Sequence, residues 1–136
     1  MGTDKYLATL EGVVVHGKKI GRSLGIPTAN IPFTPGQTGQ PDGVYVADLV
    51  LLDQGNRIVQ GILNQGSHPT VPGGIPTIEI FLFDFQEDIY DQRVLVRYHS
   101  YLRPELTFAT VEEMRLVILK DIQDAKQYFQ DKPKTD

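Results

Sequence analysis

Six short runs of strand-forming residues, separated by turn signals rich in Gly, Pro, Asn and Asp, constrain the fold of this chain more than any other feature. Strands that follow one another at such short spacing are typical of a closed antiparallel barrel. We therefore expect a mainly β fold built on a six-stranded antiparallel β-barrel. The expected strands are Leu7–Val15, Ile26–Pro32, Val44–Leu52, Arg57–Asn64, Thr77–Phe85 and Val94–Leu102.

A single amphipathic helix is expected near the C-terminal end. Thr110 and Glu113 form a capping-box pattern, which marks the start of a helix. Apolar residues then recur every three or four positions and form one stripe, which we expect to pack on the barrel wall. The stripe consists of Met114, Ile118, Ile122, Ala125 and Phe129. At 136 residues the chain has the length of one domain, 1–136, with a core at about 7–130 and a polar tail at 131–136.

Composition excludes several classes of function. The chain has no cysteine, which excludes disulfides and thiolate metal sites. Its formal net charge is -4, so a broad nucleic-acid surface is not expected. No apolar run approaches the roughly 18 residues of a membrane span, and the first residues lack the apolar core of a signal peptide. We expect a cytoplasmic protein with no membrane partner, and a monomer, because barrel closure leaves no free strand edge.

The segment Gly17–Asn30, GKKIGRSLGIPTAN, is the first chemical candidate. Its glycines allow close backbone approach to a ligand, and its three cations supply the charge that a polyphosphate needs. Thr28 and Asn30 are two residues apart, so in extended backbone they face the same side and offer oxygen ligands suited to Mg²⁺. Pro27 biases this tail toward extended geometry. The spacing is not that of a Walker P-loop, and composition alone leaves a simple solvated turn open.

Glu79 is the candidate acid–base residue, because it interrupts an otherwise apolar strand. By period-two alternation it shares a face with Thr77, Phe81 and Phe83. A carboxylate on that face lies either at a barrel mouth, where it can act as a general base, or buried with a partner. A solvent-facing glutamate is an equally open alternative.

Two polar loops complete the candidates. Asn64 and Gly66, with Pro69–Thr70, form a turn at a strand end, which alone indicates only a loop. The segment Leu102–Phe108 combines arginine, glutamate and phenylalanine, which together can hold a planar ring with polar edges. An Arg–Glu pair and a phenylalanine that anchors the helix start remain the alternative. The histidines have no metal-ligand spacing; they are His16, His68 and His99.

Taken in order, these segments resemble the riboflavin kinase family over about Leu10–Phe129. The ordered set is specific: Gly-x-Pro-Thr-Ala-Asn, then a strand glutamate, then Leu-Arg-x-Glu-x-x-Phe. The matching residues are Gly12, Val15-His16-Gly17, Gly21-Arg22, Leu24 to Asn30, Gly43-Val44-Tyr45, Gly61, Asn64, Gly66, Pro69-Thr70, Glu79, Asp84-Phe85, Asp88-Ile89-Tyr90, Arg103, Glu105 and Phe108. The resemblance implies a Greek-key barrel with the helix packed outside, as in bacterial members without the FAD-forming adenylyltransferase domain.

The resemblance also implies an activity, the transfer of the ATP γ-phosphate to the ribityl 5′-hydroxyl of riboflavin, giving FMN and ADP. It implies Glu79 as the base and Mg²⁺ held by Thr28 and Asn30. The implied ATP-binding residues are Gly17, Lys18, Lys19, Gly21, Arg22, Gly25, Pro27, Thr28 and Asn64. The implied flavin-binding residues are Leu102, Arg103, Glu105 and Phe108.

Three departures from the family pattern bear on flavin affinity and loop conformation. Asp91 stands where the family usually has glycine, and Gln65 where it usually has an apolar residue. Ser67-His68 replaces a stretch that commonly carries arginine. These departures leave open a non-catalytic flavin-binding or regulatory module on the same barrel. A module binding nucleic acid or protein is a third possibility, and the acidic charge argues against its nucleic-acid form.

Overall fold

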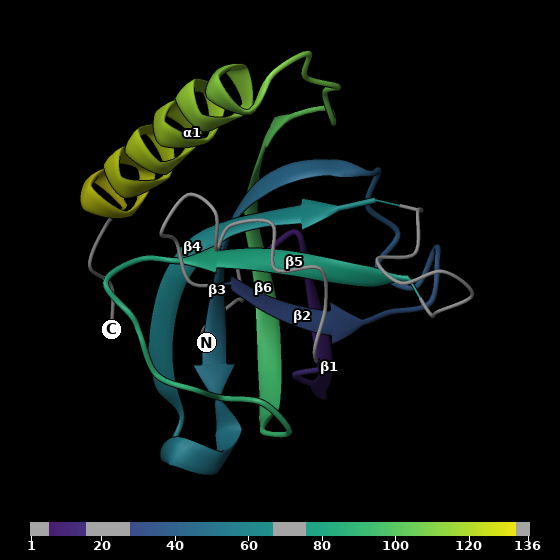
Figure 1. Ribbon diagram of the computed structural model, residues 1–136. Coiled ribbons are helices and arrows are strands. Elements are labelled where there is room, and N and C mark those ends of the chain that lie inside the picture. Colours follow the sequence, from purple (N-terminus) through teal and green to yellow (C-terminus); the bar gives the residue numbers. More distant parts are fainter. Residues whose placement is uncertain (1–5, 16–27, 67–75, 133–136) are drawn as a thin grey trace. The chain divides into compact units, whose positions relative to one another are not determined.

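The computed structural model describes residues 6–15, 28–66 and 76–132. The chain divides into two units, Met1–Glu105 and Leu106–Asp136. The first unit holds the strands β1 (Ala8–Val13), β2 (Thr28–Pro32), β3 (Gly43–Leu51), β4 (Arg57–Gln65), β5 (Thr77–Leu82) and β6 (Arg93–Arg103), with a short 3-10 helix at Leu52–Gln54 (Figure 1). Each expected strand is present within a few residues of its predicted ends.

The strands form one antiparallel sheet in the order β1-β6-β3-β4-β5-β2. Because β3, β4 and β5 are consecutive neighbours and β6 then returns to lie beside β3, the connection is a Greek key. The two edge strands then meet, since the amide of Val15 donates to the carbonyl of Asn30 at 2.8 Å. Gly12 permits this approach, because a Cβ there would lie 2.6 Å from Ile31 Cγ2. The predicted six-stranded antiparallel Greek-key barrel is confirmed.

Alternation along each strand separates a dry interior from the outer face. The fully buried inward side chains include Ile31, Leu63, Ile80 and Val96. Branched aliphatic side chains pack well on one face of a pleated sheet. Each such side chain contributes roughly 1.5–3 kcal/mol of hydrophobic burial. Because apolar side chains fill most of the interior, the outer face and the barrel ends are left for polar side chains.

A polar network closes one end of the barrel around Gln65, which is 2% exposed. Its Oε1 accepts from the Tyr98 hydroxyl at 2.8 Å, and its Nε2 donates to the Gln40 carbonyl at 2.9 Å and to Asp42 Oδ1 at 3.2 Å. Burial and the neighbouring Tyr101 and Asp42 charges raise the pKa of Tyr45, beside Tyr98, to about 12. The Gln65 side chain, which departs from the family pattern, therefore helps to close the barrel end. It faces the opposite side of the strand from its neighbour Asn64.

The second unit consists mainly of the helix α1 (Val111–Asp131). The predicted cap is present, because Thr110 Oγ1 accepts from the Glu113 amide at 3.1 Å. The return bond of the expected capping box comes instead from the amide of Ala109, at 3.4 Å from Glu113 Oε1. Packing of this helix on the barrel wall concerns both units and stays a prediction. Among the described helices, none combines the length and apolar character needed to cross a membrane.

Candidate active site

The central feature of the site is a row of three polar side chains across β2, β5 and β4. Asn30 lies directly opposite Glu79, and Glu79 lies directly opposite Asn64. Residues in such register have Cβ atoms about 5 Å apart and face the same side of the sheet. Alternation places all three on the outer face, because Ala29 and Ile80 beside them belong to the interior.

Glu79 is buried, at 8% exposure. The alternative of a solvent-facing glutamate is therefore wrong. Phe81 and Thr77, which the alternation placed on the same face, are also buried, whereas Phe83 lies beyond the end of β5. Ile62 lies opposite Phe81 in a parallel apolar row. A carboxylate in such poorly hydrated surroundings interacts strongly with any charge or dipole brought near it.

Thr28 and Asn30 place two neutral side-chain oxygens on the same face of β2. Asn30 is 2% exposed, and its Oδ1 accepts no hydrogen bond from the residues that the structure describes. Buried oxygens normally have a partner, so this atom suits a bound cation. Within the described ranges there is also no cluster of three or more His, Cys, Asp or Glu that could hold a metal. Two neutral oxygens on one face fit a hard ion such as Mg²⁺ that takes its other ligands from outside the chain.

The same row reaches the last residues of β6. Asn64 lies opposite Val44, and Val44 lies opposite Arg103, so Arg103 is the fifth position along the row from Asn30. Arg103 Nη1 donates to the Pro104 carbonyl at 3.0 Å.

Glu105 lies beside the end of β4. A Cβ at Gly66 would collide with the Glu105 carboxylate, so the absence of a side chain there admits the carboxylate. Two of the four flavin candidates, Arg103 and Glu105, thus lie toward the end of β4 that carries Asn64. Leu102 is displaced by a bulge, and Phe108 belongs to the second unit.

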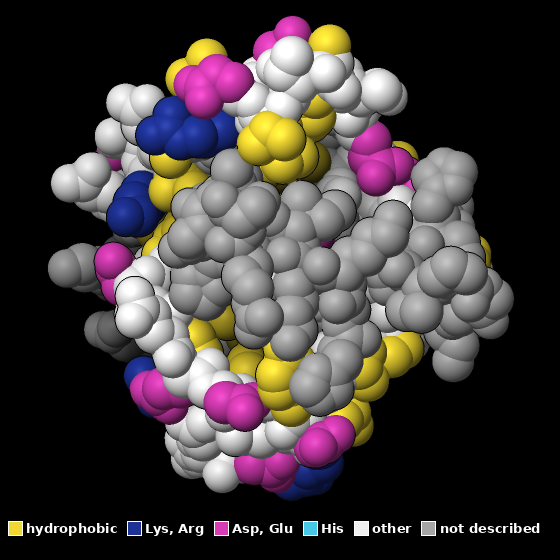
Figure 2. Space-filling model, in the orientation of Figure 1, with side chains coloured by type: hydrophobic (Ala, Val, Ile, Leu, Met, Phe, Trp, Pro, Cys, Tyr) yellow, Lys and Arg dark blue, Asp and Glu magenta, His cyan; other side chains and the backbone are white. Residues whose placement is uncertain are grey.

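The remaining predicted ligands lie outside the described residues. They are Gly17, Lys18, Lys19, Gly21, Arg22, Gly25 and Pro27. The departure Ser67-His68 and the matching pair Pro69-Thr70 also lie outside the described residues. Figure 2 shows both acidic and basic side chains among the described residues of the face in view.

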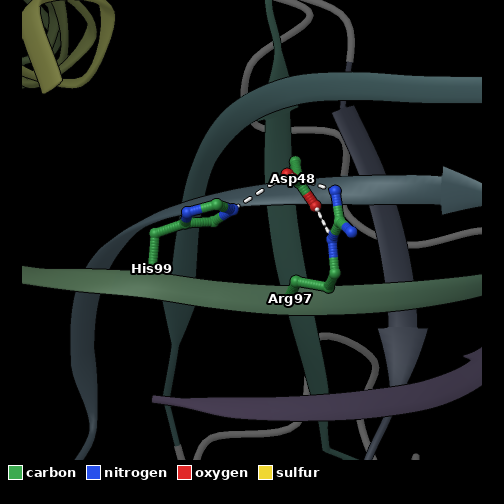
Figure 3. Close-up of polar contacts among 3 residues, drawn as sticks. All are labelled: Asp48, Arg97 and His99. Atoms are coloured by element: carbon green, nitrogen blue, oxygen red, sulfur yellow. Dashed lines mark hydrogen bonds and ion pairs between the residues drawn. The ribbon is translucent and has the colours of Figure 1, made fainter. Parts of the chain in front are cut away.

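Sequence reasoning missed a buried cluster on the outer face of β3 and β6. Asp48 Oδ1 accepts from Arg97 Nε at 2.6 Å, and Asp48 Oδ2 accepts from Arg97 Nη2 at 2.9 Å and contacts His99 Nε2 at 2.8 Å (Figure 3). Burial alone would raise the pKa of Asp48, but hydrogen bonds from His99 and Arg97 outweigh it and lower that pKa. A signal was available, because Asp48 interrupts an apolar run and Arg97 and His99 sit at alternate positions of the last strand.

The Asp91 departure has a backbone explanation. Asp91 has a φ of 67°, the left-handed region that favours glycine, and its amide donates to the Val14 carbonyl at 2.8 Å. Aspartate is among the few other residues that enter this region readily. The turn is therefore kept without the glycine.

Comparisons with known proteins point to one family. The family model for flavokinase, riboflavin kinase, matches residues 5–129. The bifunctional riboflavin kinase/FMN adenylyltransferase of Haemophilus influenzae is 37% identical over 118 residues, which cover 87% of this chain and 37% of the relative. The protein of the same description from Escherichia coli K12 is 34% identical over 120 residues, covering 88% of this chain and 37% of the relative. The chain therefore spans little more than a third of the length of these relatives.

A solved structure shares the fold. The riboflavin kinase of Trypanosoma brucei superposes with a TM-score of 0.63 at 20% identity, covering 96% of this chain and 83% of that one.

Proposed function

The chain belongs to the riboflavin kinase family, and on that premise we propose that it transfers the γ-phosphate of ATP to the ribityl 5′-hydroxyl of riboflavin, giving FMN and ADP. The observation that carries the proposal is the row Asn30–Glu79–Asn64, in which a buried carboxylate stands between two amides. A row of this kind holds an acceptor hydroxyl beside a base and beside oxygen ligands for a metal–nucleotide complex.

Glu79 is proposed to accept the proton of the 5′-hydroxyl. The hydroxyl oxygen then forms a bond to the γ-phosphorus, and the bond from that phosphorus to the bridging oxygen breaks, releasing ADP. Packing of Glu79 in the sheet, with Phe81 next on the same face, limits its rotation. Most of the rate gain in phosphoryl transfer comes from such positioning and from charge neutralisation.

The substrates are assigned to the two sides of the row. Thr28 and Asn30 would hold Mg²⁺, which would neutralise part of the phosphate charge. Gly17–Arg22 would bind the ATP phosphates, with Asn64 beside them. Leu102, Arg103, Glu105 and Phe108 would contact riboflavin and keep water from the transferred phosphoryl group.

The decisive experiment compares Glu79→Gln with the parent chain, following FMN and ADP by chromatography after incubation with riboflavin, ATP and Mg²⁺. We expect FMN formation to fall at least about 100-fold, the usual contribution of a general base. Binding of ATP should survive, because the amide keeps the size of the side chain. A matched control is Glu11→Gln, an exposed strand glutamate on β1, which should stay within about twofold of the parent. Unchanged turnover in Glu79→Gln would remove the assigned base, and no FMN from the parent chain would remove the function.

We further propose that the protein acts as a monomer in the cytoplasm, where ATP is available. Support for the monomer comes from the meeting of β1 and β2, which leaves little sheet edge for a second copy. Light scattering coupled to gel filtration measures this state directly, and a dimer mass would contradict it.

A further inference from the structure

The strand β6 carries a β-bulge at His99. Ala47 lies opposite Tyr98, but the next residue of β3, Val46, lies opposite Ser100. His99 is therefore the extra residue of the bulge. Because side chains alternate with a period of two, one inserted residue exchanges the faces of everything that follows it in the strand.

A second bulge follows at Leu102. Tyr45 lies opposite Tyr101, whereas Val44 lies opposite Arg103. Without the bulge at His99, regular pairing would put Tyr101 opposite Val44 on the outer face. With it, the Tyr101 ring packs edge-on against Tyr45, with centroids 5.2 Å apart. The two bulges together bring Arg103 to the row of Asn64 and Glu79.

The first bulge is fastened to β3 by the buried cluster of Asp48, Arg97 and His99 (Figure 3). The side chains of His99 and Asp48 are only 2% and 4% exposed. The ring of Tyr6 contacts the imidazole edge-on at 5.0 Å, and the Arg97 guanidinium lies 4.8 Å from the Tyr6 ring centre. The extra residue is thus held at its side chain by a charged partner on the neighbouring strand.

We propose that His99 and Asp48 are positioning residues for the flavin side of the site. Their contact holds the bulge in place, and the bulge sets the register of β6 against β3 that brings Arg103 into the row. The inference rests on the proposed function, because Arg103 is there assigned to riboflavin. Neither residue touches the reacting atoms, so the effect should fall on riboflavin affinity and spare ATP.

The test uses His99→Ala, Asp48→Asn and the rescue variant His99→Gln, whose amide can again donate to Asp48. Two control variants distinguish a change in the register of β6 from a general loss of stability. Val96→Ala removes buried side-chain volume from the inner face of β6. Asp53→Asn weakens the other Asp–Arg pair of this strand, at Arg93.

Three readouts are needed for each variant: riboflavin affinity by quenching of its fluorescence, Mg·ATP affinity by calorimetry, and the Tyr45–Tyr101 ring contact by NMR. In His99→Ala we expect loss of the ring contact and about tenfold weaker riboflavin binding, since a hydrogen bond to a charged group is at stake. Binding of ATP should stay within about twofold, and His99→Gln should restore both riboflavin affinity and the ring contact. Asp48→Asn should act in the same direction if His99→Ala does not fold.

The proposal is overturned if the ring contact persists in His99→Ala, or if riboflavin affinity falls no more than in Val96→Ala. Loss of the contact with unchanged riboflavin affinity overturns it as well. If the parent chain neither binds riboflavin nor forms FMN, the proposed function fails, while the ring contact still decides whether His99 sets the register.

Discussion

Replacement of Gln65 by leucine tests whether the departure from the family pattern holds the barrel end together. Gln65 is 2% exposed and Tyr98 is fully buried, so the Tyr98 hydroxyl loses its Gln65 acceptor in a place that water does not reach and, among the described residues, keeps only the Thr38 hydroxyl beside it. An unsatisfied buried hydroxyl costs about 1–3 kcal/mol. The Gln40 carbonyl and Asp42 lie nearer the surface and can be hydrated, so their loss adds about 0.5–1.5 kcal/mol. The better burial of leucine offsets part of this, which leaves a net destabilisation of about 2 kcal/mol.

A double-mutant cycle isolates the contact that carries this estimate. Tyr98→Phe removes the other partner, so Gln65→Leu/Tyr98→Phe has no buried hydroxyl left unsatisfied. We expect the double variant to lose about 1 kcal/mol less unfolding free energy than the two single variants lose together. The reason is that removing both partners of a buried hydrogen bond is nearly neutral. Urea unfolding followed by circular dichroism gives the three differences, with unchanged m values as a check on two-state behaviour. Strict additivity, or a Gln65→Leu variant as stable as the parent, would refute the reasoning.

Two further predictions concern acid stability and backbone strain. The pKa of Asp48 lies below its unfolded value of 3.8, so its charge stabilises the fold above about pH 4 and this contribution is lost as the pH falls through the lower folded pKa. The stability difference between the parent and Asp48→Asn should accordingly be largest near neutral pH and shrink below pH 4, and a difference that grows on acidification would contradict the assigned contacts. Because Asp91 has a φ of 67°, Asp91→Ala should destabilise by about 1 kcal/mol while Asp91→Gly should not, as thermal unfolding of the pair would show.

The strands and the helix start could be predicted from the sequence because their signals are local. Alternation in Thr77–Leu82 and the capping pattern at Thr110 depend only on neighbours within a few residues. Alternation also placed Glu79 on the face of Phe81. It could not decide whether that face was solvated, since this depends on what covers the sheet.

The composition of the row is a long-range property and could not be predicted from spacing. Asn30, Asn64 and Glu79 come from strands far apart in the chain, and they meet only because β5 pairs with both β2 and β4. The resemblance to a family indicated which residues belong to the site, whereas the structure showed that Glu79 lies between Asn30 and Asn64. The His99 cluster escaped notice for the same reason, because the polar residues Asp48, Arg97 and His99 could be joined only once β3 and β6 were known to pair.

The polar row lies on the outside of the barrel, so strand register decides which side chains enter the core and which belong to the site. In β2, Ala29 and Ile31 fill the interior while Thr28 and Asn30 face outward, so a slip of one residue would bury the amide in the core and expose the aliphatic side chain. The inward residues resist such a slip through their hydrophobic burial. At the end of β6 the residues beyond His99 are more exposed and supply less of that resistance. A charged contact that fastens the bulge is therefore most useful at the point where packing no longer sets the register and where Arg103 must still reach the row.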